Sequence, residues 1–123
     1  MRLGVGLMAA AAIMAPATAH AADAPYAQAY AIVAADGTLQ SSKNIASVTK
    51  YDTGKYCIAV DPSVTVTSST PIQATARSGS RTISAYNWPN TECNNKATNT
   101  VTVFTFRASD GTRVDTQFYL TIP

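Results

Sequence analysis

The chain has 123 residues, of which 46% are hydrophobic and 13% charged, with a formal net charge of +2 and two cysteines. This length allows one small domain, and the apolar content excludes an intrinsically disordered chain. The nearly balanced charge argues against nucleic acid or an anionic membrane surface as a partner.

The first 21 residues have the pattern of a secretory signal peptide. Arg2 precedes an uncharged stretch over 3–15, and the small residues 17–22 follow as a cleavage region. The apolar stretch is shorter than the roughly 20 residues that cross a bilayer. We therefore expect a secreted, extracellular product without a membrane anchor, with one mature domain over 22–123; a cut after Ala19 is the alternative.

Export changes the chemistry that remains available to the mature chain. The only histidine, His20, lies within the predicted leader, so the mature chain has no imidazole. This excludes Ser-His-Asp and Cys-His catalysis and imidazole zinc sites. In an oxidising compartment, Cys57 and Cys93 are expected to form a disulfide, which would contribute roughly 3 to 4 kcal/mol to stability.

The mature chain is rich in Thr, Val and Tyr and has no helical periodicity, which favours strands. In chain order, strands are predicted over 29–35, 45–51, 55–61, 64–66, 72–77, 83–88, 100–108 and 114–122. Their spacing and turns predict an all-β fold, an antiparallel β-sandwich of seven or eight short strands with one disulfide.

Alternation of apolar and polar residues predicts which faces enter the core. In the strand over 55–61, Tyr56, Ile58 and Val60 share one face. The strand over 100–108 is apolar on both faces, which indicates a central strand, and 114–122 alternates with Tyr119 pointing outward. Two hairpins are expected, one joining 45–51 to 55–61 and one joining 100–108 to 114–122.

The carboxylates favour a structural interpretation over a hydrolytic pair. Asp36 and Asp110 precede glycines and Asp52 begins another turn, where Asp bonds the backbone. Asp61 and Asp115 lie on polar strand faces and are expected to be solvated or paired with Lys or Arg. We therefore predict that the chain is not an enzyme and carries no catalytic residue, metal or cofactor.

One cluster suggests ligand binding. Tyr86 and Trp88 are two residues apart on one strand face, with the amides of Asn87 and Asn90 beside them. Flat aromatic rings with neighbouring amides are what a sugar-binding platform uses. The alternative is that Trp88 packs over the disulfide in the core. A further hypothesis is that the polar loop over 89–99 inhibits an extracellular hydrolase.

The order of short motifs resembles that of a group of small secreted bacterial proteins of unknown function. These motifs are Asp36-Gly37-Thr38-Leu39, Gly54-Lys55-Tyr56-Cys57, Asp61-Pro62-Ser63, a second cysteine, and the closing Phe118 to Pro123. One departure is Ile45, which stands where those sequences often have Gly-Val. The resemblance implies a disulfide-bridged β-sandwich that serves as a structural or interaction module, with no assigned catalytic residues.

These observations predict a secreted, monomeric, non-enzymatic protein. We expect it to associate with an extracellular protein or a polysaccharide outside the cell or at its surface.

Overall fold

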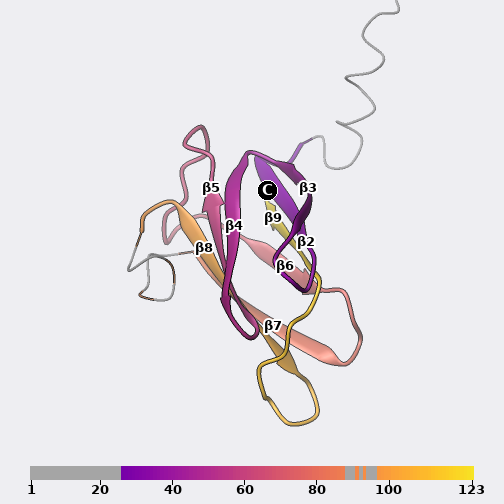
Figure 1. Ribbon diagram of the computed structural model, residues 1–123. Helices are drawn as coiled ribbons and strands as arrows, with labels where there is room; N and C mark the ends of the chain where they lie inside the picture. The colour runs from indigo at the N-terminus through magenta and orange to yellow at the C-terminus, as the bar shows by residue number, and fades with distance from the viewer. Residues whose placement is uncertain (1–25, 88–90, 92, 94–96) are drawn as a thin grey trace, which may run out of the picture.

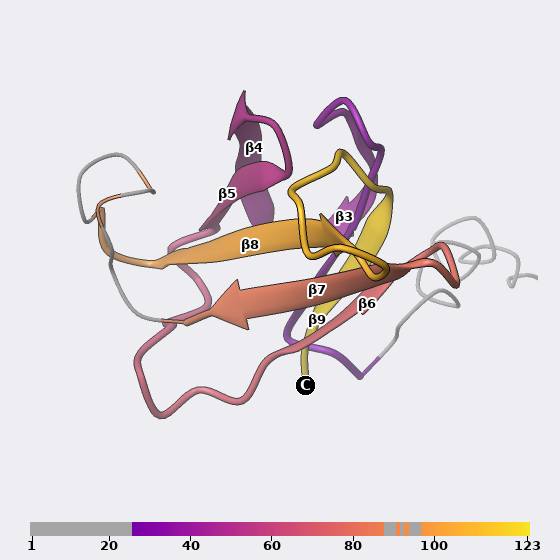
Figure 2. The ribbon, with the colours of Figure 1, turned by 90° about the horizontal axis from the view of Figure 1, so that it is seen from below.

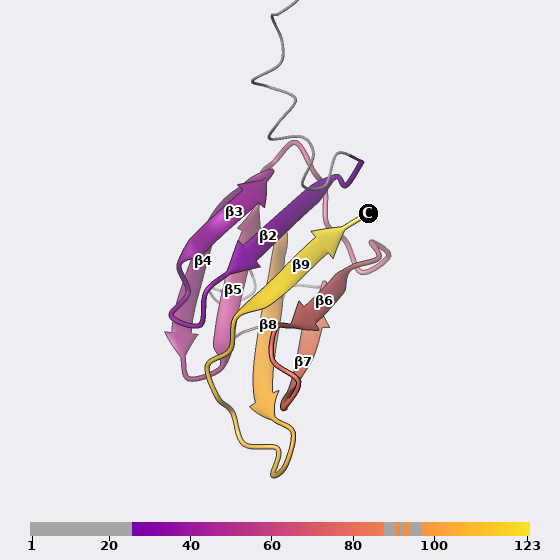
Figure 3. The ribbon, with the colours of Figure 1, turned by 90° about the vertical axis from the view of Figure 1, so that its right-hand side faces the viewer.

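A computed structural model describes residues 26–87, 91, 93 and 97–123, which form eight antiparallel strands and no helix. They build two four-stranded sheets that pack face to face (Figure 1, Figure 3). The first sheet has the order β3-β2-β9-β6, with bounds β3 Leu39–Lys43, β2 Ala29–Val33, β9 Phe118–Ile122 and β6 Gln73–Ala76. The second has the order β4-β5-β8-β7, with bounds β4 Ile45–Asp52, β5 Lys55–Val60, β8 Thr100–Arg107 and β7 Arg81–Tyr86. The predicted all-β antiparallel sandwich is thus confirmed.

The core lies between the two sheets and follows the predicted alternation. Both β5 and β9 turn every second residue inward, and β8 lies between β5 and β7 as the predicted central strand. The predicted short strand over 64–66 is wrong, although Val64 and Val66 are both buried. The buried hydrophobic cluster comprises Ala29, Ala31, Val33, Tyr56, Ile58, Val60, Val64, Val66, Val101, Val103, Phe118, Leu120 and Ile122.

Tyr56 connects the two sheets through its ring and its hydroxyl group. The side chain is fully buried, and its ring packs edge-on against Phe118 with the centroids 5.0 Å apart. The hydroxyl donates a hydrogen bond to the carbonyl of Ala35 at 2.7 Å and accepts one from the amide of Thr116 at 3.1 Å. Ala35 follows β2 and Thr116 precedes β9, so one phenol group fixes where both strands meet the second sheet.

Gly54 brings the β4–β5 turn against the segment that leads to β9. Its φ is +64°, and a side chain there would approach the carbonyl of Thr105 to 2.6 Å. Its amide donates to the carboxylate of Asp115 at 2.8 Å, and Lys50 forms an ion pair with that carboxylate at 3.2 Å. Asp115 is therefore paired with a lysine, as predicted.

The predicted hairpin between 100–108 and 114–122 is wrong. The chain does turn back after β8, with a bridge between Phe106 and Arg113, but β9 begins only at Phe118. It pairs with β2 and β6 in the other sheet (Figure 3), and Figure 2 shows that β9 crosses the direction of β8 instead of running alongside it. The physical reason is that Asp115 and Thr116 are held by Gly54 and Tyr56, which directs the chain across the sandwich instead of along β8. The predicted β4–β5 hairpin is confirmed.

The sequence pattern did not predict β3, because its residues LQSSK are mostly polar and do not alternate. After β3 the chain changes sheets at Asn44, which has a positive φ of 55°. The Asn44 side chain donates to the carbonyl of Gln28 at 2.8 Å. Asparagine tolerates this backbone conformation better than most residues, so it is suited to the corner between β3 and β4.

The predicted disulfide between Cys57 and Cys93 is present, with the two Cα atoms 5.2 Å apart. Cys57 lies on the outward face of β5 beside Thr102 of β8, and both Cys93 and Thr102 are fully buried. The bond attaches the Cys93 region to the outer side of the second sheet.

Replacing Tyr56 with Phe removes the hydroxyl but keeps the ring. We expect the Tyr56→Phe variant to lose about 1 to 3 kcal/mol of unfolding free energy, because the buried amide of Thr116 and the part-buried carbonyl of Ala35 lose their partner. Urea denaturation measures this loss. Tyr30→Phe is the control, since among the described residues the Tyr30 hydroxyl has one hydrogen-bond partner, the hydroxyl of Ser41 at 3.4 Å, and that contact is part-buried. Equal losses in the two variants would contradict the role given to Tyr56.

Alkaline pH should destabilise the fold through the same group. Burial, with the nearby negative charge of Asp115, raises the pKa of Tyr56 above its ordinary value of 10.0. The resulting stabilisation is complete below pH 10 and is lost as the pH rises through the folded-state pKa. Urea denaturation between pH 8 and about 12 should show a steeper loss of stability in the wild type than in Tyr56→Phe. Identical pH profiles would rule out this effect.

Candidate binding site

The predicted sugar platform lies only in part within the described residues. Tyr86 ends β7 and is half-buried, and its ring packs edge-on against Phe104 with the centroids 5.5 Å apart. Trp88 and Asn90 lie outside the described residues, as does most of the loop over 89–99. The platform and the inhibitor loop therefore stay predictions.

Asn87 has a structural contact that its sequence position did not reveal. Its side-chain amide donates to the backbone carbonyl of Thr70 at 2.5 Å and approaches that of Ser68 at 3.4 Å. These bonds attach the end of β7 to the loop before β6, so the amide hydrogens of Asn87 are already engaged by the fold.

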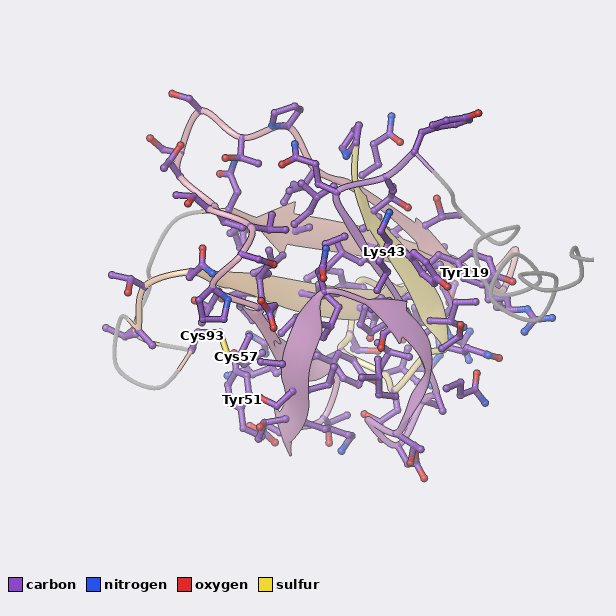
Figure 4. All side chains as sticks on the ribbon, turned by 90° about the horizontal axis from the view of Figure 1, so that it is seen from above. Lys43, Tyr51, Cys57, Cys93 and Tyr119 are labelled. Atoms are coloured by element: carbon purple, nitrogen blue, oxygen red, sulfur yellow. A yellow bond between two sulfur atoms is a disulfide. The ribbon has the colours of Figure 1, made fainter. Side chains whose placement is uncertain are left out.

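The outer face of the second sheet carries aromatic rings that contact side chains of the protein itself. Phe104 contacts Tyr86, and the guanidinium of Arg113 lies 5.4 Å from the centroid of the Phe104 ring. The ammonium of Lys55 lies 6.0 Å from the centroid of the Tyr51 ring. Cys57, Cys93 and Tyr51 lie on this side of the molecule, while Lys43 and Tyr119 lie on the other side (Figure 4).

The outer face of the first sheet forms a second aromatic surface, which we call the tyrosine face. It lies over β3, β2, β9 and β6, and no described strand covers it (Figure 3). Its centre is a shallow depression of about 480 Å³. The residues of the tyrosine face are Tyr30, Ile32, Ser41, Thr75, Tyr119 and Thr121.

The strand register places the two tyrosines of this face close together. Tyr119 of β9 pairs with Ile32 of β2, and Tyr30 of β2 pairs with Thr121 of β9. Tyr30 and Tyr119 are therefore diagonal neighbours on adjacent strands, an arrangement in which the two Cα atoms are generally about 7 to 8 Å apart. Both are partly exposed, and hydroxyl-bearing side chains lie around them.

Arg77 extends the tyrosine face at one end. It follows β6, and its guanidinium lies 5.7 Å from the centroid of the Tyr119 ring. This is the geometry of a cation–π contact, which limits the movement of the ring.

Sequence reasoning recognised Tyr119 as outward but did not single out Tyr30. The available signal was the alternation in Ala29–Val33, where Ala29, Ala31 and Val33 are buried and Tyr30 and Ile32 point outward. The signal is weak because both faces of this strand are apolar.

The described carboxylates act mainly in turns. Asp36, Asp61 and Asp110 each accept a hydrogen bond from the amide two residues later. The pKa of each carboxyl group is lowered below its ordinary value of 3.8, for Asp36 by the side chain and then the amide of Thr38, and for Asp61 and Asp110 chiefly by the amide bonds. Asp52 bonds the amide of Thr53. The turn roles predicted for Asp36, Asp52 and Asp110 are confirmed. These groups are ionised near neutral pH and stabilise local backbone, which does not suit a general acid.

Comparison with known proteins gives no assignment, because no protein-family profile, curated protein or solved structure matches the chain. The resemblance to small secreted proteins therefore stays a prediction. In the described part of the chain, no group of three or more His, Cys, Asp or Glu residues is placed to hold a metal ion. No helix among the described residues is long and apolar enough to cross a membrane.

Proposed function

We propose that this protein is an exported, non-enzymatic module that binds a polysaccharide outside the cell through the tyrosine face. The observation that carries this proposal is the position of Tyr30 and Tyr119 on adjacent strands of one exposed sheet face. Aromatic rings on a flat surface stack against the apolar faces of sugar rings, and neighbouring hydroxyls provide hydrogen bonds.

Contacts within the fold restrain the tyrosine face. β2 and β9 pair along five consecutive residues, and their inward side chains belong to the buried core. Tyr119 is held by Arg77, and the hydroxyl of Tyr30 lies 3.4 Å from that of Ser41. A preorganised surface loses little conformational entropy on binding, which favours a binding module.

The presence of the disulfide supports an extracellular site of action. A bond between Cys57 and Cys93 persists in oxidising compartments, which agrees with the leader predicted from residues 1–21. The carboxylates of Asp36, Asp61 and Asp110 accept hydrogen bonds from turn amides. Because their oxygens are engaged in these bonds, they favour a binding function over hydrolytic catalysis.

The two faces of the sandwich offer different platforms, and the contacts favour the tyrosine face. The Tyr86 ring contacts Phe104, and the amide of Asn87 bonds the loop before β6. In contrast, Tyr30 and Tyr119 line an open depression. The Tyr86 and Trp88 platform is therefore the second candidate for the same function.

Removal of either ring from the tyrosine face should weaken binding. Tyr30→Ala and Tyr119→Ala are each expected to lower affinity for the bound polysaccharide by about tenfold, because one stacking contact is lost. The measurement is depletion of the oxidised protein, with the leader removed, by a panel of neutral and acidic insoluble polysaccharides. Tyr30→Phe and Tyr119→Phe should bind nearly as well as the wild type.

Two matched variants complete the experiment. Tyr26→Ala is the control, because Tyr26 is 96% exposed and precedes β2, and its binding should be unchanged. A loss of binding in Tyr86→Ala with full binding in Tyr119→Ala would move the site to the other sheet. Failure of the wild type to bind any polysaccharide of the panel would refute the proposed function.

A further inference from the structure

A second cavity lies beyond the end of the tyrosine face that carries Arg77. It has a volume of about 270 Å³ and lies between the turn that joins β6 to β7 and the segment that leads to β9. Its lining includes Ala35, Arg77, Ser78, Arg81, Thr116 and Gln117.

The cavity brings together two arginines from the two sheets. Arg77 follows the last residue of β6, and Arg81 is the first residue of β7. The turn between them is fixed by two backbone bonds, from Arg81 to the carbonyl of Ser78 at 3.2 Å and from Ala108 to that of Ser80 at 2.9 Å. The amide of Arg77 also bonds the carbonyl of Gln117 at 2.9 Å. Hydrogen bonds therefore hold the backbone in place at both arginines.

The charge of these arginines is not balanced by a carboxylate within the described residues. Asp115 also lines the cavity, but its oxygens already contact the ammonium of Lys50 and the amide of Gly54. The other described ion pairs join Asp52 to Lys55 and Asp110 to Arg107. Arg107 lies opposite Arg81 in the register of β7 with β8, and the Asp110 carboxylate is paired with Arg107 and not with Arg81.

Arg81 retains an unused hydrogen-bond donor. One terminal nitrogen, Nη1, donates to the hydroxyl of Ser80 at 2.9 Å. Its Nε atom is buried and has no acceptor among the described residues. A buried donor without a partner is costly, so a small movement of the guanidinium that brings Nε to a ligand acceptor would add a bond that Nε lacks in the fold.

We propose that Arg77 and Arg81 bind the carboxylate of an acidic sugar in a polysaccharide that lies across the tyrosine face. A guanidinium presents planar donors that match the two oxygens of a carboxylate. Arg77 contacts Tyr119 and also lines the cavity, so it joins the stacking surface to the charged pocket. This inference rests on the proposed function and specifies its ligand as a polymer that contains uronic acid.

The chemistry of the surface favours such a sugar over an acidic peptide. Arg77 lines the cavity and contacts Tyr119, so the cavity lies next to a face of tyrosines and hydroxyl side chains, which suits sugar rings. None of the residues that line the depression of the tyrosine face is acidic, so this part of the surface does not repel an anionic chain. In the arginine cavity, the negative charge of Asp115 is paired with Lys50.

The experiment compares an oligogalacturonate with its methyl ester, which keeps the sugar rings but removes the charge. Calorimetric titration of the oxidised mature protein should show about tenfold tighter binding of the free acid. Arg81→Gln should reduce this preference severalfold while it keeps the affinity for the ester. Arg77→Gln should also reduce the preference severalfold, together with a smaller loss of affinity for the ester, because Arg77 also contacts the Tyr119 ring. Arg113→Gln is the matched control, because Arg113 contacts Phe104 on the other sheet, and it should behave as the wild type.

A second readout does not depend on variants. In the wild type, the nitrogen and proton resonances of the Arg81 Nε–H group should shift on titration with the free acid and stay in place with the ester. Added salt should weaken binding of the acid more than binding of the ester, because the contact is ionic and lies near the surface.

The outcomes separate this inference from the proposed function. Equal affinity of the wild type for acid and ester, or full preference for the acid in both arginine variants, would overturn the carboxylate site. If binding still depended on Tyr119, that result would continue to support polysaccharide binding through the tyrosine face. Tight binding of poly-glutamate that depends on Arg81 but not on Tyr119 would overturn the sugar assignment. Absence of binding to every oligosaccharide would overturn both proposals.

Discussion

The hydroxyl group of Tyr56 is the contact on which the arrangement of the two sheets depends. It lies in the core, between the carbonyl of Ala35 and the amide of Thr116. These residues belong to the two segments that enter or leave the first sheet beside β2 and β9. A buried phenol needs a partner, and here it bonds two backbone groups, the buried amide of Thr116 and the part-buried carbonyl of Ala35. The same residue therefore contributes apolar burial to the core and determines where the chain crosses from one sheet to the other.

This contact also positions both parts of the proposed binding surface. β2 and β9 carry Tyr30 and Tyr119, so their pairing sets the spacing of the rings on the tyrosine face. Ala35 and Thr116, the two partners of the Tyr56 hydroxyl, line the cavity that contains Arg77 and Arg81. A buried bond between the sheets thus shapes an exposed surface.

The sequence predicted the features that depend on local patterns. Alternation revealed the inward face of β5, the turn residues revealed the roles of Asp36, Asp52 and Asp110, and the two cysteines predicted the disulfide. The partner of β9 could not be predicted this way, because its apolar alternation suits either sheet and the choice depends on distant contacts of Asp115 and Thr116. The tyrosine face was missed for a similar reason, since Tyr30 and Tyr119 are 89 positions apart and only the register of β2 with β9 makes them neighbours.

In the proposed function, the first sheet, and not the disulfide-bearing sheet, contacts the polysaccharide. The most direct measurement is the mapping of backbone amide shifts in the isotope-labelled oxidised protein during titration with an oligogalacturonate. We expect the largest shifts along β2 and β9 and in the turn between Arg77 and Arg81, with little change along β5 and β8. Shifts concentrated at the end of β7 and around Cys93, with β2 and β9 unchanged, would contradict this proposal.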